Sequence, residues 1–174
     1  MLRRTMLAGL ASLTLVGGCA SSSGGSGGRT PGGAGQRDIL VTLKRDPEFR
    51  SLLEWVNAAD YAPKLRRLAP VTLFAPTEEA FGEIRPGLRG RLLRPENRDL
   101  LRAILDRHVV AGRVTRDQMV RERRLRTIDG MEVAITHQGQ SLRFGSGNLV
   151  RLNIGTDIGV IHAIDRVQLP PHFF

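Results

Sequence analysis

The spacing of the apolar residues changes part-way along this 174-residue chain, and this change restricts the folds open to it. Between positions 49 and 105 many apolar residues recur every three or four positions, which predicts amphipathic helices. After Arg124 they alternate with polar residues, as in Met131, Val133 and Ile135, which predicts strands. Helices that mostly precede strands indicate an α+β fold with an antiparallel or mixed sheet.

Local signals predict where several elements begin. Asp46-Pro47 is a helix start, because aspartate caps free N–H groups and proline suits the first helical position. Residues 71–75 form a short apolar run typical of a buried strand, and Pro76 and Thr77 then open a helix. Residues 100–108 predict another amphipathic helix that ends near a histidine. Residues 115–118 form a capping-box pattern for a further short helix.

The C-terminal half is predicted to consist of hairpins. Gly139-Gln140 and Ser146-Gly147 are the expected turns. Val150, Leu152 and Ile154 continue the alternation begun at Met131, and two apolar segments then close the domain. These segments are residues 160–164 and 167–169.

The first residues have the pattern of a secretory signal. Arg3 and Arg4 precede an apolar stretch from Met6 to Val16, which is too short to span a bilayer as a helix. Leu15-Val16-Gly17-Gly18-Cys19 then resembles a bacterial lipobox, so we expect residues 1–18 to be a lipoprotein signal peptide. The alternative is an incidental cysteine in an ordinary secretory signal cleaved nearby.

Cys19 is the only cysteine, which leaves no intrachain disulfide and no cysteine-based metal site. Its thiol is the expected site of acylation, and two or three acyl chains would hold the protein stably on a membrane. Residues 19–37 contain the cysteine and a Ser/Gly-rich stretch, which predicts a flexible tether. Ala20 and Ser21 follow the cysteine in place of aspartate, which by resemblance to bacterial lipoproteins favours the outer membrane.

The chain is basic, and arginine supplies nearly all of the excess charge. Loss of Arg3 and Arg4 would leave 24 Lys+Arg (26 − 2) against 17 Asp+Glu, a net charge of +7. Such a surface attracts phosphates, anionic lipids and acidic polysaccharides, although a simple solvated face is the alternative. Two runs concentrate the arginines. The expected polyanion contact is Arg116, Arg121, Arg123, Arg124 and Arg126, and the second run is Arg85, Arg89, Arg91, Arg94 and Arg98.

The sequence contains none of the motifs that would indicate catalysis or a cofactor. The histidines form no H-E-x-x-H pattern, and no phosphate-binding glycine loop joins a predicted strand to a helix. The G-x-S-x-G match at positions 24–28 lies in the tether, where a nucleophile elbow cannot form. Few aromatic residues lie among the arginines, so specific nucleic-acid recognition is not expected. A non-enzymatic protein without a cofactor or metal is the resulting interpretation.

Three ordered segments resemble the fasciclin (FAS1) domain family. Residues 72–81, Thr-Leu-Phe-Ala-Pro-Thr-Glu-Glu-Ala-Phe, resemble its first signature, and the segment from Gly159 to Asp165, continuing through Leu169-Pro170-Pro171, resembles its second. Residues 104–112 lie between them and resemble the central histidine segment of the family. The resemblance covers residues 38–171. It implies a FAS1-like β-wedge of antiparallel or mixed strands packed with several short helices.

The resemblance also assigns roles to motif residues, which are mainly structural. Phe74, Ala75 and Phe81 are expected to pack the strand against the helix that follows. His108 and His162 are expected to be core residues satisfied by hydrogen bonds. The motif residues carried over are Phe74, Pro76, Thr77, Phe81, His108, His162 and Asp165.

Animal members of the family have been linked to adhesion through a Tyr-His pair and an Asp-Ile pair. The tyrosine position is Arg107 in this chain, whereas Asp157-Ile158 is kept. Together with the expected anchor, the tether, the arginine runs and the lack of catalytic motifs, the resemblance indicates a non-enzymatic, envelope-anchored adhesion or binding module with a polyanion or protein partner. The alternative, also from the family, is a carrier of a small apolar ligand in a cleft.

Overall fold

A computed structural model describes residues 38–139 and 141–170 of the chain. The predicted signal peptide and the tether lie outside these residues, as does Cys19. The helical elements are α1 (Ile39–Arg45), η1 (Pro47–Phe49), α2 (Arg50–Ala58), α3 (Ala62–Arg67), α4 (Glu78–Gly82), α5 (Pro86–Leu92), η2 (Pro95–Asn97), α6 (Arg98–Asp106) and α7 (Arg116–Glu122). The strands are β1 (Val71–Pro76), β2 (Val109–Ala111), β3 (Arg124–Arg126), β4 (Glu132–Gln138), β5 (Ser141–Phe144), β6 (Gly147–Gly155) and β7 (Gly159–Ile164).

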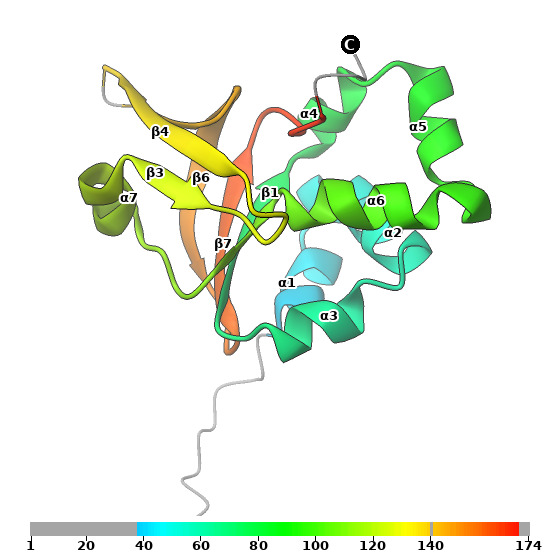
Figure 1. The fold of residues 1–174 in the computed structure, drawn as a ribbon, viewed down its shortest axis with the longest axis horizontal. Helices are drawn as coiled ribbons and strands as arrows, with labels where there is room; N and C mark the ends of the chain where they lie inside the picture. The colour runs from blue at the N-terminus through cyan, green and yellow to red at the C-terminus, as the bar shows by residue number, and fades with distance from the viewer. Residues whose placement is uncertain (1–37, 140, 171–174) are drawn as a thin grey trace, which may run out of the picture. The chain divides into compact units, whose positions relative to one another are not determined.

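The strands form one mixed sheet in the order β2-β1-β7-β6-β5-β4-β3. All neighbouring strands are antiparallel except β1 and β7, which run parallel with Val71 opposite Gly159. A single bridge between Val110 and Thr127 brings β2 back to the end of β3, so the sheet curls toward closure. Figure 1 shows helices α1 to α6 on one side of β1 and β7, and strands β3 to β6 on the other. The predicted α+β class with a mixed sheet and short helices is confirmed.

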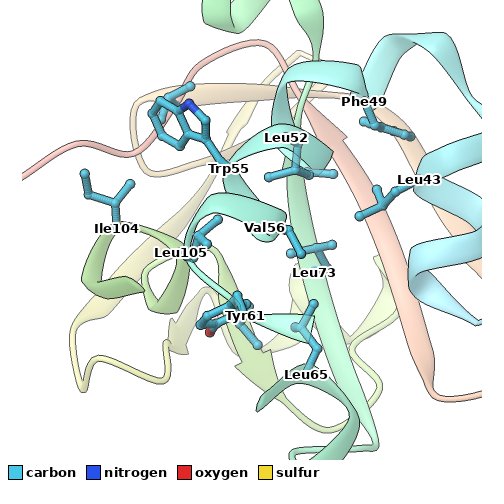
Figure 2. Close-up of a cluster of buried hydrophobic side chains, with 14 of the residues drawn as sticks. Leu43, Phe49, Leu52, Trp55, Val56, Tyr61, Leu65, Leu73, Ile104 and Leu105 are labelled. Atoms are coloured by element: carbon cyan, nitrogen blue, oxygen red, sulfur yellow. The ribbon is translucent and has the colours of Figure 1, made fainter. Parts of the chain in front are cut away.

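Every residue of β1 and β7 is buried, because both faces of this strand pair are covered. One face meets the helices, where Leu73 packs with Leu52, Trp55 and Ile104 in the larger apolar cluster. Figure 2 shows these side chains converging from α2, α6 and β1. Trp55 is 1% exposed and lies within this cluster.

The opposite face of the pair supports a smaller apolar cluster beneath the hairpins. Phe74 stacks on Phe144 of β5, with 3.7 Å between ring centroids and 6° between ring planes. The expectation that Phe74 packs against the following helix is therefore wrong. Alternation along β1 sends Ala75 to the helices and Phe74 to the hairpins, whereas Phe81 of α4 contacts Trp55 edge-on.

Glycine 159 explains the close approach of the two central strands. A Cβ atom at this position would lie 1.9 Å from the carbonyl oxygen of Val71, so no other residue fits without moving a strand. The parallel pair thus depends on a residue that lacks a side chain.

The hairpin region differs from the sequence pattern in two details. The β5–β6 turn is Gly145-Ser146, one residue earlier than predicted, because Phe144 pairs with Gly147 and Gly145 supplies the positive φ of 59°. The alternating pattern predicts that Val150 and Met131 face the core, but their side chains are 52% and 49% exposed, so this prediction is wrong. Register shifts between positions 149 and 154 of β6 displace Val150 from the buried face, which Leu149 occupies.

Phe74→Ala should lower the free energy of unfolding by about 3–5 kcal/mol, because it leaves a cavity under Phe144. Urea unfolding of the full chain measures this loss. Val150→Ala is the matched control and should change stability by less than about 0.5 kcal/mol, since the side chain is exposed. Equal unfolding midpoints for the two variants would contradict the assignment of Phe74 to the core.

Candidate functional site

His108 lies between the end of α6 and the start of β2 and is 1% exposed. Its Nε2 accepts the backbone N–H of Gln168 at 3.0 Å, so Nδ1 carries the proton and donates to the carbonyl of Ile104 at 2.7 Å. Burial is the main cause that lowers the pKa of His108 to about 4; the hydrogen bond to Ile104 and the charge of Asp129 oppose this shift, and the charge of Arg107 adds to it. The ring is therefore neutral at pH 7.

His162 is fully buried within β7 and lies against the Phe74 ring. Its Nδ1 accepts the backbone N–H of Asn153 at 3.2 Å, and its Nε2 donates to the carbonyl of Val114 at 2.8 Å. Burial lowers the pKa of this imidazole as well. The two bonds tie β6 and the segment before α7 to the central strand pair.

Both ring nitrogens of His108 and His162 are thus bonded to the backbone. A ring in this state has no free lone pair for a metal and no proton to exchange with a substrate. The described residues also contain no group of three or more His, Cys, Asp or Glu side chains that could hold a metal ion. The most buried titratable groups therefore support the fold and offer no catalytic constellation.

The other motif residues hold neighbouring elements together. Thr77 caps α4 by accepting the N–H of Ala80 at 3.4 Å, directly after Pro76 ends β1 opposite Ile164. Asp165 accepts the backbone N–H and the side-chain amide of Asn148, both at 2.6 Å, which fixes β6 to the end of β7.

The predicted polyanion contact lies on α7 and β3, and we call these five arginines the α7–β3 arginines. All five residues are exposed. Arg124 pairs with exposed Glu132 at 3.4 Å, and Arg126 donates to the carbonyl of Gly130 at 3.3 Å. Arg123 ends α7 in the left-handed region with φ 55°, which turns the chain sharply into β3. Local sequence thus places these side chains together at one end of the domain.

The two positions that the fasciclin resemblance associates with adhesion differ in their surroundings. Arg107 replaces the tyrosine and pairs with Asp129 at 3.0 Å. Asp157 lies exposed in the turn between β6 and β7, and Arg113 fixes this turn by donating to the carbonyls of Thr156, Asp157 and Gly159. The role of Arg113 has no local sequence signal, because its partners lie more than 40 positions away.

Polar networks among the helices were also missed by sequence reasoning. Tyr61 is buried and donates to Asp106 at 2.5 Å, and Lys64 bonds both oxygens of the same carboxylate at 2.6 Å. Burial, and then the bond to Asp106, raises the pKa of Tyr61. These networks join helices that are distant in sequence, so no pattern of spacing reveals them.

The residues matched by the fasciclin domain model are 47–170, most of the chain. This chain belongs to the fasciclin domain family. The family is non-catalytic, which agrees with the bonding of the two buried histidines. Among the described residues of this fasciclin chain, no helix has the length and apolarity needed to cross a bilayer.

Relatives extend across bacteria and animals. The chain is 35% identical to Protein sll1483 of Synechocystis over 76% of its own length and 73% of that protein. It is 30% identical to Immunogenic protein MPB70 of Mycobacterium bovis, covering 90% of the chain and 83% of that protein. The FAS1 domain pair of the insect cell adhesion molecule Fasciclin I has the same fold, with a TM-score of 0.70 and 17% identity over 78% of this chain and 51% of that one.

The burial of His108 predicts that stability falls as the pH falls from about 6.5 toward 4. The unfolded chain binds a proton on this residue near pH 6.5, whereas the folded chain resists it until about pH 4. The full loss attributable to His108 is about 3 kcal/mol. Urea unfolding of the full chain at several pH values between about 5 and 7 measures the free energy of unfolding over much of this pH range. Most carboxylates stay ionised over that interval.

His108→Asn is the comparison, because asparagine is polar but does not titrate. The variant should be less stable at pH 7 but should lose less stability between pH 7 and pH 5 than the parent. Parallel pH profiles for the two proteins would contradict the neutral, buried state of His108.

Proposed function

We propose that this fasciclin domain protein is a non-enzymatic binding module anchored to the cell envelope, where it mediates adhesion or contact with a matrix. The observation that carries the proposal is the gathering of the α7–β3 arginines on exposed positions at one end of a domain with no catalytic constellation in its described residues. The partner would be an envelope or extracellular polyanion, or a protein of complementary charge.

The anchor rests on the sequence before the domain. Acylation of Cys19 would fix the chain to a membrane, and the residues between it and Asp38 would act as a tether. A flexible tether of about 16 residues reaches roughly 20–25 Å, which leaves the domain free to meet partners near the membrane. We place the protein in the envelope, at the outer membrane, because Ala20 and Ser21 follow the cysteine.

Charge supports a polyanion as the partner. Between Arg116 and Arg126 the sequence has five arginines and two acidic residues, so this surface is positive. Guanidinium groups bind phosphate and carboxylate oxygens in pairs, which suits repeating anionic polymers. Specific nucleic-acid recognition is not proposed, because no aromatic residue lies within this stretch to stack on bases.

The alternative function is transport of a small apolar ligand. The hollow between α4, α5 and residues 166–169 has apolar walls, but Arg85, Glu83 and Arg166 also line it. Glu83 and Arg166 pair with each other at 3.1 Å, but a purely apolar ligand would offer no partner for the charge of Arg85, so the binding module is preferred.

Lipidation is tested directly by metabolic labelling with a clickable palmitate analogue. The mature full chain should carry the label, and Cys19→Ser should abolish it, because the thiol is the proposed acceptor. An unlabelled parent, or a labelled Cys19→Ser variant, would contradict the anchor.

The polyanion contact is tested by salt elution of the full chain from immobilised dextran sulfate. Arg123→Ala combined with Arg124→Ala should elute at lower salt than the parent, because each lost ionic contact reduces the salt dependence of binding. The melting temperature should remain nearly unchanged, since both side chains are exposed.

The matched control is Arg94→Ala combined with Arg98→Ala, which removes the same charge from exposed positions elsewhere. If both double variants elute at the same salt concentration, net charge alone governs retention and the proposed contact is wrong.

A further inference from the structure

Helix α5 separates two neighbouring hollows in the surface. The first, of about 320 Å³, lies between α4, α5 and residues 166–169. The second, of about 630 Å³, lies between α5 and the start of α6. Arg85 and Leu88 line both, so the two adjoin each other at the first turn of α5, and we call them together the α5 hollows.

The first of the α5 hollows has mostly apolar walls, whereas the second is lined by apolar and polar groups in about equal measure. In the first hollow, Ile84 and Val167 are 8% and 4% exposed and lie beside Ala80 and Leu169. In the second, Leu92 and Leu100 lie along the inner side of α5 and α6. Each volume lies within the range of small-molecule sites in proteins, and such walls can receive an alkyl chain.

The charges of the α5 hollows are not balanced locally. Arg85 and Arg91 line the second hollow, and no acidic residue lines it. Within residues 38–139 and 141–170, neither arginine has a carboxylate oxygen within 4.0 Å of its guanidinium. In the first hollow, by contrast, Glu83 is already paired with Arg166 at 3.1 Å. Two uncompensated positive charges therefore adjoin an apolar wall.

We infer that the α5 hollows bind a single-chain amphiphile with a phosphate head, the alkyl chain lying in the first hollow and the phosphate meeting Arg85 and Arg91. A phosphate monoester carries about −1.5 to −2 charges at pH 7, which matches two arginines better than the single charge of a carboxylate. Arginine forks bind phosphate oxygens bidentately. The chain would cover the partly exposed side of Leu88, which belongs to both hollows.

This site is separate from the proposed polyanion contact. Helices α5 and α7 lie at opposite ends of the long axis of the domain (Figure 1). The test of amphiphile binding and the test of polyanion binding therefore have independent outcomes. A variant of one surface serves as the control for the other.

The test is calorimetric titration of the full chain carrying Cys19→Ser, so that no acyl group of its own competes. Octyl phosphate, kept at concentrations where it is monomeric, should bind saturably. Three control compounds should each bind at least tenfold more weakly. Inorganic phosphate lacks the alkyl chain, octanol lacks the phosphate head, and butyl phosphate loses most of the chain's apolar contact. No saturable binding of octyl phosphate, or equal binding of inorganic phosphate, would overturn the inference.

Two double variants locate the site. Arg85→Gln with Arg91→Gln should weaken octyl phosphate binding at least tenfold and leave the melting temperature unchanged. Arg91 contributes to the fold through its backbone carbonyl, which accepts a hydrogen bond from the Asn97 side chain, and the Arg85 side chain does not cap α5. The backbone contact of Arg91 is therefore kept in the variant. Arg121→Gln with Arg123→Gln removes the same charge at α7 and should have no effect.

Equal weakening by both double variants would overturn the site, because it would show a response to net charge. Binding to vesicles of phosphatidylglycerol without binding to monomeric octyl phosphate would overturn it as well, since the protein would then recognise a membrane surface.

Discussion

The parallel pairing of β1 with β7 is the contact on which the rest of the domain depends. It joins strands that are far apart in sequence, and both are buried on both faces. The pairing needs the bare backbone of Gly159 beside Val71, because any side chain would collide with a carbonyl. Once the pair exists, alternation along each strand supplies apolar residues to two separate clusters, one under the helices and one under the hairpins.

The two buried histidines complete this framework by bonding backbone groups that regular structure leaves without partners. His108 connects the end of α6 to the segment after β7, and His162 connects β6 to the segment before α7. An aliphatic residue in either position would leave a buried carbonyl without its donor and a backbone N–H without its acceptor, and the unsatisfied carbonyl is costly in a protein interior. Histidine is useful here because its neutral ring both donates and accepts.

Because the interior groups are occupied by structural bonds, the surface is where this domain can interact. Its two arginine runs are treated differently by the fold. In the run from Arg85 to Arg98, Arg89 bonds Ser51 and Glu54 and lies over the Phe81 ring, so it serves the packing of α5. Arg85 and Arg91 of the same run are left facing the α5 hollows. The α7–β3 arginines remain on the outside, where at most weak, exposed ion pairs compete for them.

The sequence by itself determined the class of fold, most helix starts and the strands whose signals are local: the caps at Asp46 and Thr77, the apolar run of β1 and the alternation of β4. It also indicated that His108 and His162 would be core residues with bonded rings, although not which atoms they bond. Only the tertiary structure decided that Phe74 faces Phe144, that Val150 is exposed, and that Arg85 and Arg91 share a hollow. The reason is physical: caps and periodicity depend on neighbours within one turn or strand, whereas register shifts, ring stacking and hollows depend on residues brought together from distant parts of the chain.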